Sequence, residues 1–81
     1  MNIHAVIRGT KTIEEFKSRQ KIMNDFAEKA FMEHMKLIDG VWHEGAPVKC
    51  WHDDDGYFCV EYASGKWWHY LFHENKAPDI W

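Results

Sequence analysis

The chain has 81 residues, a formal net charge of −3 and a hydrophobic content of 46%, which suits one small globular domain and argues against disorder. Lysine and arginine are scattered along the chain, so a reader of duplex DNA or RNA, which needs a concentrated positive surface, is disfavoured. The sequence contains no run of about 18 apolar residues, so no membrane span is predicted. The start of the chain also lacks the apolar core of a signal peptide. Two cysteines make no disulfide framework, so we expect a cytoplasmic protein without membrane contact.

The first segment with regular spacing, residues 2–8, fits two structures. Its apolar residues match both the helical and the strand period. Asn2 as an N-cap and Gly9 as the residue after the helix favour a short helix. The alternative is a strand that adds a fourth member to the sheet predicted below.

A long amphipathic helix is predicted over residues 12–39. It begins with a capping box, in which Thr12 accepts from the backbone of Glu15 and the Glu15 side chain reaches back; Gly40 ends it. A helix of this length spans about 39 Å, whereas a seven-residue strand spans about 23 Å, so the helix must overhang the sheet, bend or support a partner. Its predicted apolar face consists of Ile13, Phe16, Met23, Phe26, Ala27, Ala30, Phe31, Leu37 and Ile38.

Three short strands, residues 47–53, 57–63 and 66–73, are predicted to form an antiparallel meander. Three-residue loops ending on Gly56 and Gly65 give type I turns with a G1 bulge, and this register, unlike one with two-residue turns, gathers the apolar residues on one face. The predicted core face carries Val48, Cys50, Phe58, Val60, Tyr62, Trp68, Tyr70 and Phe72. The opposite face, called the outer face below, carries Lys49, Trp51, Tyr57, Cys59, Glu61, Trp67, His69 and Leu71.

These elements predict an α+β fold, with one long helix packed across the core face of a three-stranded antiparallel meander in a single domain, residues 1–81. The helix residues expected to contact Val60, Tyr62, Trp68 and Tyr70 are Phe16, Met23, Phe26, Ala30 and Leu37. Residues 74–81 show no periodicity and are expected to be a tail, whose Trp81 either docks on the domain or stays free.

The histidines and cysteines invite a metal site, but the predicted register separates them. Cys50 and His52 project from the core face, whereas Cys59 and His69 pair on the outer face, so the four side chains cannot converge on one tetrahedral ion. We therefore predict no metal and no cofactor, with cysteines that behave as small hydrophobic residues.

Neither the Cys59–His69 pair nor the lone His34 is predicted to be catalytic. A thiol beside an imidazole is how nucleophilic cysteines are activated, but the sequence offers no third group to orient the imidazole, because Glu61 lies too far along the strand. His34 falls in the middle of the apolar helix face and is expected to be a core histidine bonded to a backbone carbonyl. The sequence thus predicts a protein that is not an enzyme.

The outer face is the predicted functional surface, because soluble domains seldom leave contiguous aromatic side chains in water. Its expected partner is another protein, or a second copy of the chain in a homodimer. The alternative is that the tail with Ile80 and Trp81, or the connector with Trp42, folds back over it. The predicted partner-binding residues are Trp51, Tyr57, Trp67, His69 and Leu71, edged by Lys49, Glu61 and Lys66.

Two nucleic-acid interpretations stay open beside protein binding. Aromatic residues on an open sheet can stack single-stranded bases, but few lysines surround them here. Alternatively, acidic residues would imitate phosphates toward a nucleic-acid enzyme. The residues considered for that role are Asp53, Asp54, Asp55, Glu14, Glu15, Asp25, Glu28 and Glu33.

The type of protein is itself informative. A short acidic domain with an aromatic sheet and no catalytic motif, whose most distinctive stretch is WHDDDGYFCVEYASGKWWHY, resembles the small inhibitors that phages and mobile elements encode against bacterial defence systems, anti-CRISPR proteins among them. The resemblance implies a non-enzymatic inhibitor that acts by binding.

Overall fold

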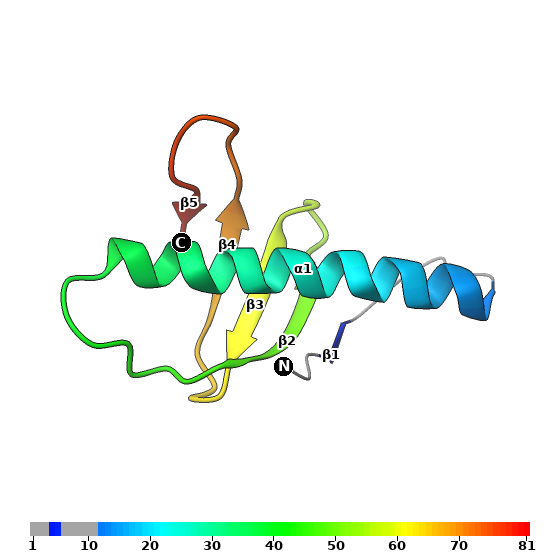
Figure 1. The fold of residues 1–81 in the computed structure, drawn as a ribbon, viewed down its shortest axis with the longest axis horizontal. Coiled ribbons are helices and arrows are strands. Elements are labelled where there is room, and N and C mark those ends of the chain that lie inside the picture. The colour runs from blue at the N-terminus through cyan, green and yellow to red at the C-terminus, as the bar shows by residue number, and fades with distance from the viewer. Residues whose placement is uncertain (1–3, 6–11) are drawn as a thin grey trace.

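The computed structural model describes residues 4–5 and 12–81, and these form one helix packed on one mixed sheet (Figure 1). The sheet has the strand order β1-β2-β3-β4-β5, with β1 parallel to β2 and all other neighbours antiparallel. This is the predicted α+β fold. Its elements are β1 (His4–Ala5), α1 (Ile13–Leu37), β2 (Pro47–His52), β3 (Phe58–Tyr62), β4 (Trp67–Leu71) and β5 (Asp79–Ile80). Among the described residues, no helix is both long enough and apolar enough to cross a bilayer.

The prediction favoured a short helix over a strand for residues 2–8. It is wrong for the two residues of that segment that the structure describes. His4 and Ala5 form β1, which pairs in parallel with Lys49 and Cys50. Pairing there satisfies backbone groups along β2 that would otherwise be a free sheet edge. The remainder of 2–8 lies outside the described residues.

The predicted register of the meander is confirmed. Cys59 is paired with Trp51 on β2 and with His69 on β4. Both hairpins close as expected, since Gly56 and Gly65 have φ values of 86° and 91° and donate to the carbonyls of Asp53 and Tyr62 at 3.0 and 2.9 Å. Three-residue loops therefore fix which side chains face the helix.

One member of the predicted core face changes, because the pairing of β2 with β3 shifts between Pro47 and Lys49. Pro47 lies opposite Tyr62 and is fully buried, whereas Val48 is only partly buried. A β-bulge inserts an extra residue on one strand and so changes which side chain faces the core.

The helix begins and ends close to where the sequence predicts. Thr12 Oγ1 accepts a hydrogen bond from the Glu15 amide at 3.0 Å, which is the first half of the capping box. After Leu37 the chain leaves the helix, with Ile38 already extended at φ −86° and ψ 145°.

The predicted apolar face of α1 is too broad. Only Met23, Ala27, Ala30 and His34 are buried along the helix, whereas Phe16 and Leu37, expected in the core, are 41% and 54% exposed. Phe26, in the middle of α1, is 42% exposed but stacks on Phe72 with ring centroids 5.8 Å apart. The reason is geometric: α1 crosses the strands (Figure 1), and its 25 residues span about 37 Å, but five strands about 4.8 Å apart span only about 20 Å. The predicted overhang is therefore present, and the ends of the helix have no sheet beneath them.

The core contains a chain of hydrogen bonds between buried polar groups. Tyr70 Oη lies 2.7 Å from His34 Nδ1 and 2.6 Å from Tyr62 Oη. His34 is a core histidine as predicted, but its partner is the Tyr70 hydroxyl and not a backbone carbonyl. Burial lowers the pKa of His34, and Glu44 opposes that shift only in part, so burial favours the neutral ring, which shares a hydrogen bond with the Tyr70 hydroxyl.

Candidate functional site

Two tryptophans from neighbouring parts of the outer face remain in contact with solvent. Trp51 on β2 and Trp67 on β4 lie with ring centroids 5.4 Å apart, and Trp67 is 48% exposed. Lys49 Nζ lies 5.5 Å from the centre of the Trp51 ring, and Glu61 is paired with both Lys49 and Trp67 across the sheet. We call these four residues the Trp51–Trp67 strip.

The C-terminal tail covers another part of the outer face. The backbones of Trp81 and His69 exchange two hydrogen bonds, of 2.8 and 3.3 Å. The Trp81 ring stacks on the His69 ring at 4.9 Å and meets Tyr57 edge-on at 5.0 Å. Trp81 therefore docks on the domain and covers Tyr57 and His69, while leaving the Trp51–Trp67 strip half exposed.

The other residues considered as covers lie on the core side. Ile80 on β5 and Trp42 in the connector both pack against the hydrophobic core. Trp42 contacts Tyr62 at 4.9 Å and donates to the Gly45 carbonyl. Among the described residues proposed as covers, only Trp81 reaches the outer face.

The last predicted partner-binding residue, Leu71, is separated from the strip. It is 39% exposed and lines, with Tyr57 and Phe26, a hollow of about 170 Å³ at the opposite end of the strands. The structure thus divides the predicted surface into the Trp51–Trp67 strip, a part covered by Trp81, and Leu71 beside the hollow.

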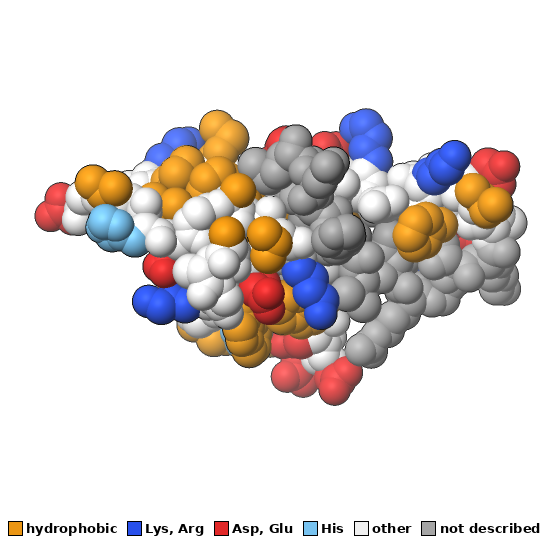
Figure 2. Space-filling model, turned by 90° about the horizontal axis from the view of Figure 1, so that it is seen from below, with side chains coloured by type: hydrophobic (Ala, Val, Ile, Leu, Met, Phe, Trp, Pro, Cys, Tyr) orange, Lys and Arg blue, Asp and Glu red, His pale blue; other side chains and the backbone are white. Residues whose placement is uncertain are grey.

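Three of the acidic residues considered as phosphate mimics are paired with cations. Along α1, Glu15 pairs with Arg19 at 2.8 Å, Asp25 with Lys21 at 3.0 Å and Glu33 with Lys36 at 3.2 Å. Seen from below, red and blue side chains alternate with hydrophobic ones (Figure 2). Acidic and basic side chains are therefore interspersed along α1.

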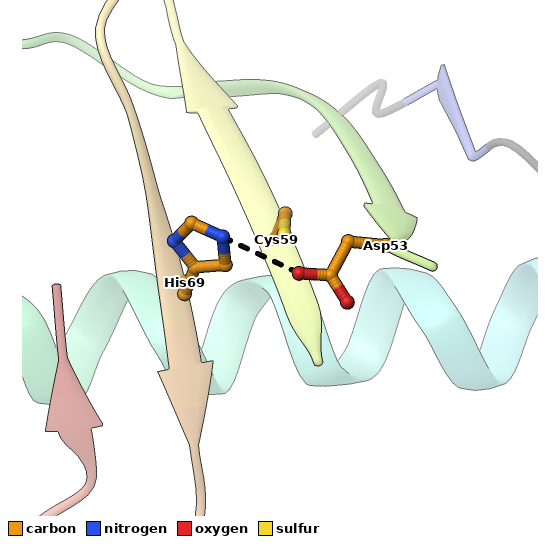
Figure 3. A group of neighbouring side chains, drawn as sticks. All are labelled: Asp53, Cys59 and His69. Carbon is orange, nitrogen blue, oxygen red and sulfur yellow. Dashed lines mark ion pairs between the residues drawn. The ribbon is translucent and has the colours of Figure 1, made fainter. Parts of the chain in front are cut away.

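Beneath Trp81 the outer face gathers a carboxylate, a thiol and an imidazole. Asp53 follows β2, Cys59 lies on β3 and His69 on β4, and their side chains point toward one another (Figure 3). One ligand-type atom from each lies within 4.8 Å of the other two, and Asp53 Oδ2 is 3.3 Å from His69 Nε2. We call these three residues the Asp53–Cys59–His69 cluster.

Contacts outside the cluster fix the orientation of its carboxylate and its imidazole. Asp53 Oδ1 accepts from the backbone amides of Asp55 and Tyr57, at 3.0 and 2.9 Å, which leaves Oδ2 directed at His69. On the far side of the ring, His69 Nδ1 lies 3.1 Å from the Trp81 carbonyl oxygen. A proton on Nδ1 donates to that carbonyl, and Nε2 then faces the carboxylate.

The thiol of the cluster is protonated. Cys59 is fully buried, and burial together with the negative charge of Asp53 raises its pKa to about 11. Its sulfur donates to the Tyr57 carbonyl at 3.6 Å. A nucleophilic cysteine needs a lowered pKa and solvent access, and Cys59 has neither.

The cluster also lacks the order of a catalytic triad. In a triad, the carboxylate and the nucleophile occupy opposite nitrogens of the imidazole. Here Asp53 faces Nε2, and Figure 3 shows the sulfur of Cys59 on the same side of the ring, whereas Nδ1 is occupied by Trp81. The arrangement suits three groups that share one small central species.

Cys59 and His69 are neighbours, as the predicted register has them, but Asp53, which lies beside both, was not predicted there. The predicted register also separated Cys50 correctly, whose thiol lies in the core and donates to the Met23 carbonyl at 3.8 Å. Asp53 was placed at the end of the predicted strand 47–53 and considered only as an acidic residue, although it stands two residues after Trp51 and therefore shares the outer face by the alternation of a strand. That parity is the signal that would have found it.

Comparison of the chain with protein-family models, with curated proteins and with solved structures finds no match.

Proposed function

We propose that this chain is a non-enzymatic protein-binding module, and that the Trp51–Trp67 strip is its contact surface for a folded protein of a different chain. The observation that carries the proposal is that Trp67 keeps 48% of its surface exposed although Trp81 folds back beside it. Tryptophan dominates the binding energy of many protein interfaces, at positions that lose their water on binding.

The chemistry of the strip favours a protein as the occupant. A cation and an anion, Lys49 and Glu61, stand opposite each other across β2 and β3. They complement a partner that offers apolar residues edged by both signs of charge. A nucleic-acid strand would require a predominantly basic surround, and a phosphate mimic would require unbroken acidic charge, whereas Glu15, Asp25 and Glu33 of α1 are each paired with a cation.

Inhibition by binding is the form of this function that the resemblance to small phage-encoded inhibitors favours. Such a protein needs a rigid surface but no reactive group. The protonated thiol of Cys59 agrees with this, because burial keeps its pKa far above neutrality.

The experiment is affinity purification of the tagged chain from its host, followed by direct binding measurements with each purified candidate partner. Trp67→Ala should weaken binding by about 100-fold, since a central interface tryptophan contributes about 2 kcal/mol or more. Val41→Ala is the matched control, because Val41 is 74% exposed and apolar but lies in the connector outside the sheet, and it should leave binding unchanged.

Sedimentation equilibrium of the purified chain separates this proposal from self-association. We expect a monomer at high concentration. A dimer that Trp67→Ala converts to monomer would replace the proposal with a homodimer, and equal binding by Trp67→Ala and the unmodified chain would remove the strip from consideration.

A further inference from the structure

We propose that the Asp53–Cys59–His69 cluster is a binding site for a divalent transition-metal ion of the Zn²⁺ class. This inference is independent of the protein partner proposed above. It takes Asp53 Oδ2, Cys59 Sγ and His69 Nε2 as ligands, which are the oxygen, sulfur and nitrogen donors that Zn²⁺ accepts.

The separation of the ligand atoms fits one ion. Two ligands bound to Zn²⁺ at about 2.0 to 2.1 Å in tetrahedral geometry are about 3.3 Å apart, and Asp53 Oδ2 lies 3.3 Å from His69 Nε2. The sulfur lies within 4.8 Å of a ligand-type atom of each of the other two residues, and a Zn–S bond of about 2.3 Å would place it about 3.6 Å from them.

The groups around the cluster are those of a supported metal site. A histidine that binds a metal usually donates its other ring N–H to a carbonyl or carboxylate, which fixes its tautomer. His69 Nδ1 has the Trp81 carbonyl at 3.1 Å for that purpose. Two backbone amides hold Asp53 Oδ1, so that Oδ2 alone is directed inward.

The orientation of the imidazole also suits a cation. Nδ1 lies 3.1 Å from the Trp81 carbonyl oxygen, which can only accept a hydrogen bond, so Nε2 is the nitrogen left to act as a ligand. It lies 3.3 Å from Asp53 Oδ2. An ion between these two atoms would also have the nearby sulfur of Cys59 within reach, and Zn²⁺ binds thiolates.

Access and proton balance agree with an ion that enters from solvent. The side chains of Asp53 and His69 are each partly exposed, at 22% and 23%, while Cys59 forms the buried floor. On binding, the thiol proton and any proton on Nε2 leave to solvent, and the Zn–S, Zn–N and Zn–O bonds form without oxidation or reduction. Three protein ligands leave the fourth tetrahedral position to water.

The test is titration of the metal-free chain with Co²⁺, followed by competition with Zn²⁺. We expect saturation at one equivalent, with a thiolate-to-cobalt charge-transfer band in the near ultraviolet and visible bands of tetrahedral Co²⁺, both removed by Zn²⁺. Cys59→Ser should abolish the charge-transfer band, while Cys50→Ser, which alters the thiol on the core side, should retain it.

A second pair of variants separates ligand loss from misfolding. Asp53→Asn keeps the oxygen that accepts from the two loop amides but loses the inner carboxylate oxygen, and should weaken Zn²⁺ affinity by about 100-fold or more, at least the upper limit of the 10- to 100-fold effect of an outer contact. Asp55→Asn, in the same loop, should leave it unchanged. A rise in melting temperature with Zn²⁺ should occur in the unmodified chain and in Asp55→Asn, and should be absent in Asp53→Asn.

Two results would overturn the site. The first is the absence of a charge-transfer band at one equivalent of Co²⁺, which would leave the cluster as an ion pair and a thiol that bind no metal. The second is a band that survives Cys59→Ser and disappears in Cys50→Ser, which would place any thiolate ligand in the core.

Discussion

The two faces of the sheet hold similar residues in different surroundings. On the core face, His34 is bonded to Tyr70, and Tyr70 to Tyr62, in a chain closed to solvent. On the outer face, His69 stands between a carboxylate and a carbonyl beside a thiol, and remains partly exposed. The core chain gives His34 Nδ1 and both tyrosine hydroxyls a partner, whereas the outer cluster presents atoms that are suited to a further ligand.

This difference teaches that residue type alone does not decide the role of a side chain. A histidine surrounded by neutral hydroxyls and tryptophan rings is stabilised in its uncharged form and serves packing. A histidine facing a carboxylate and a thiol has the surroundings of a ligand. The neighbouring tryptophans 67 and 68 differ in the same way, because successive residues of β4 point to opposite faces.

The largest expected effect comes from this pair of tryptophans. Trp68→Ala should reduce the free energy of unfolding by about 3 kcal/mol, because Trp68 contacts His34, Tyr62 and Trp42 in the core. Trp67→Ala should cost less than about 1 kcal/mol, the value of an exposed aromatic contact. Urea denaturation measures both, and equal losses would contradict the division between the faces.

A smaller loss is expected from removing one hydroxyl in the core. Tyr70→Phe leaves both His34 and Tyr62 without their partner, and an unsatisfied buried group costs about 1 to 3 kcal/mol, so we expect about 2 kcal/mol in the same assay. Tyr57→Phe changes a tyrosine that is 37% exposed and should leave stability within about 0.5 kcal/mol. A neutral Tyr70→Phe would show that the hydrogen-bond chain does not stabilise the fold.

The pH dependence of stability gives the next test of the core face. Burial lowers the pKa of His34 below its ordinary 6.5, so the unfolded chain binds this proton more readily than the folded one. Stability is therefore complete above pH 6.5 and falls as the pH drops through the range below it. In His34→Gln, denaturation curves at about pH 7.5 and about pH 5.5 should differ less than in the unmodified chain. An identical difference in both would show that His34 is not the group responsible.

Much of the fold could be predicted from the sequence, because the glycines of the loops and the alternation of apolar residues along the strands indicated the same register. Gly56 and Gly65 specified the hairpin loops, and one register then gathered the apolar side chains. The width of the buried stripe on α1 could not be predicted in this way. That width depends on the direction in which the helix crosses the sheet. The presence of Phe16 and Leu37 on the apolar side of the helix does not reveal this direction.

The candidate site was predictable in part, for a related reason. Alternation placed Trp51, Trp67, Cys59 and His69 on one face correctly. The position of Trp81 depends on β5, which is only two residues long and has no periodicity that could be recognised. Asp53 was overlooked because aspartate at the end of a strand also favours a turn, and its side chain does both, with Oδ1 in the loop and Oδ2 in the cluster.

The central claim, that the outer face performs recognition, is tested most directly by photo-crosslinking from position 67. A photoreactive phenylalanine analogue placed there, and separately at position 41, is irradiated in host cells, and the adducts are identified by mass. We predict one abundant adduct with a different protein from position 67 and none with that protein from position 41. Equal adducts from both positions, or an adduct from position 67 with a second copy of the chain alone, would contradict the claim.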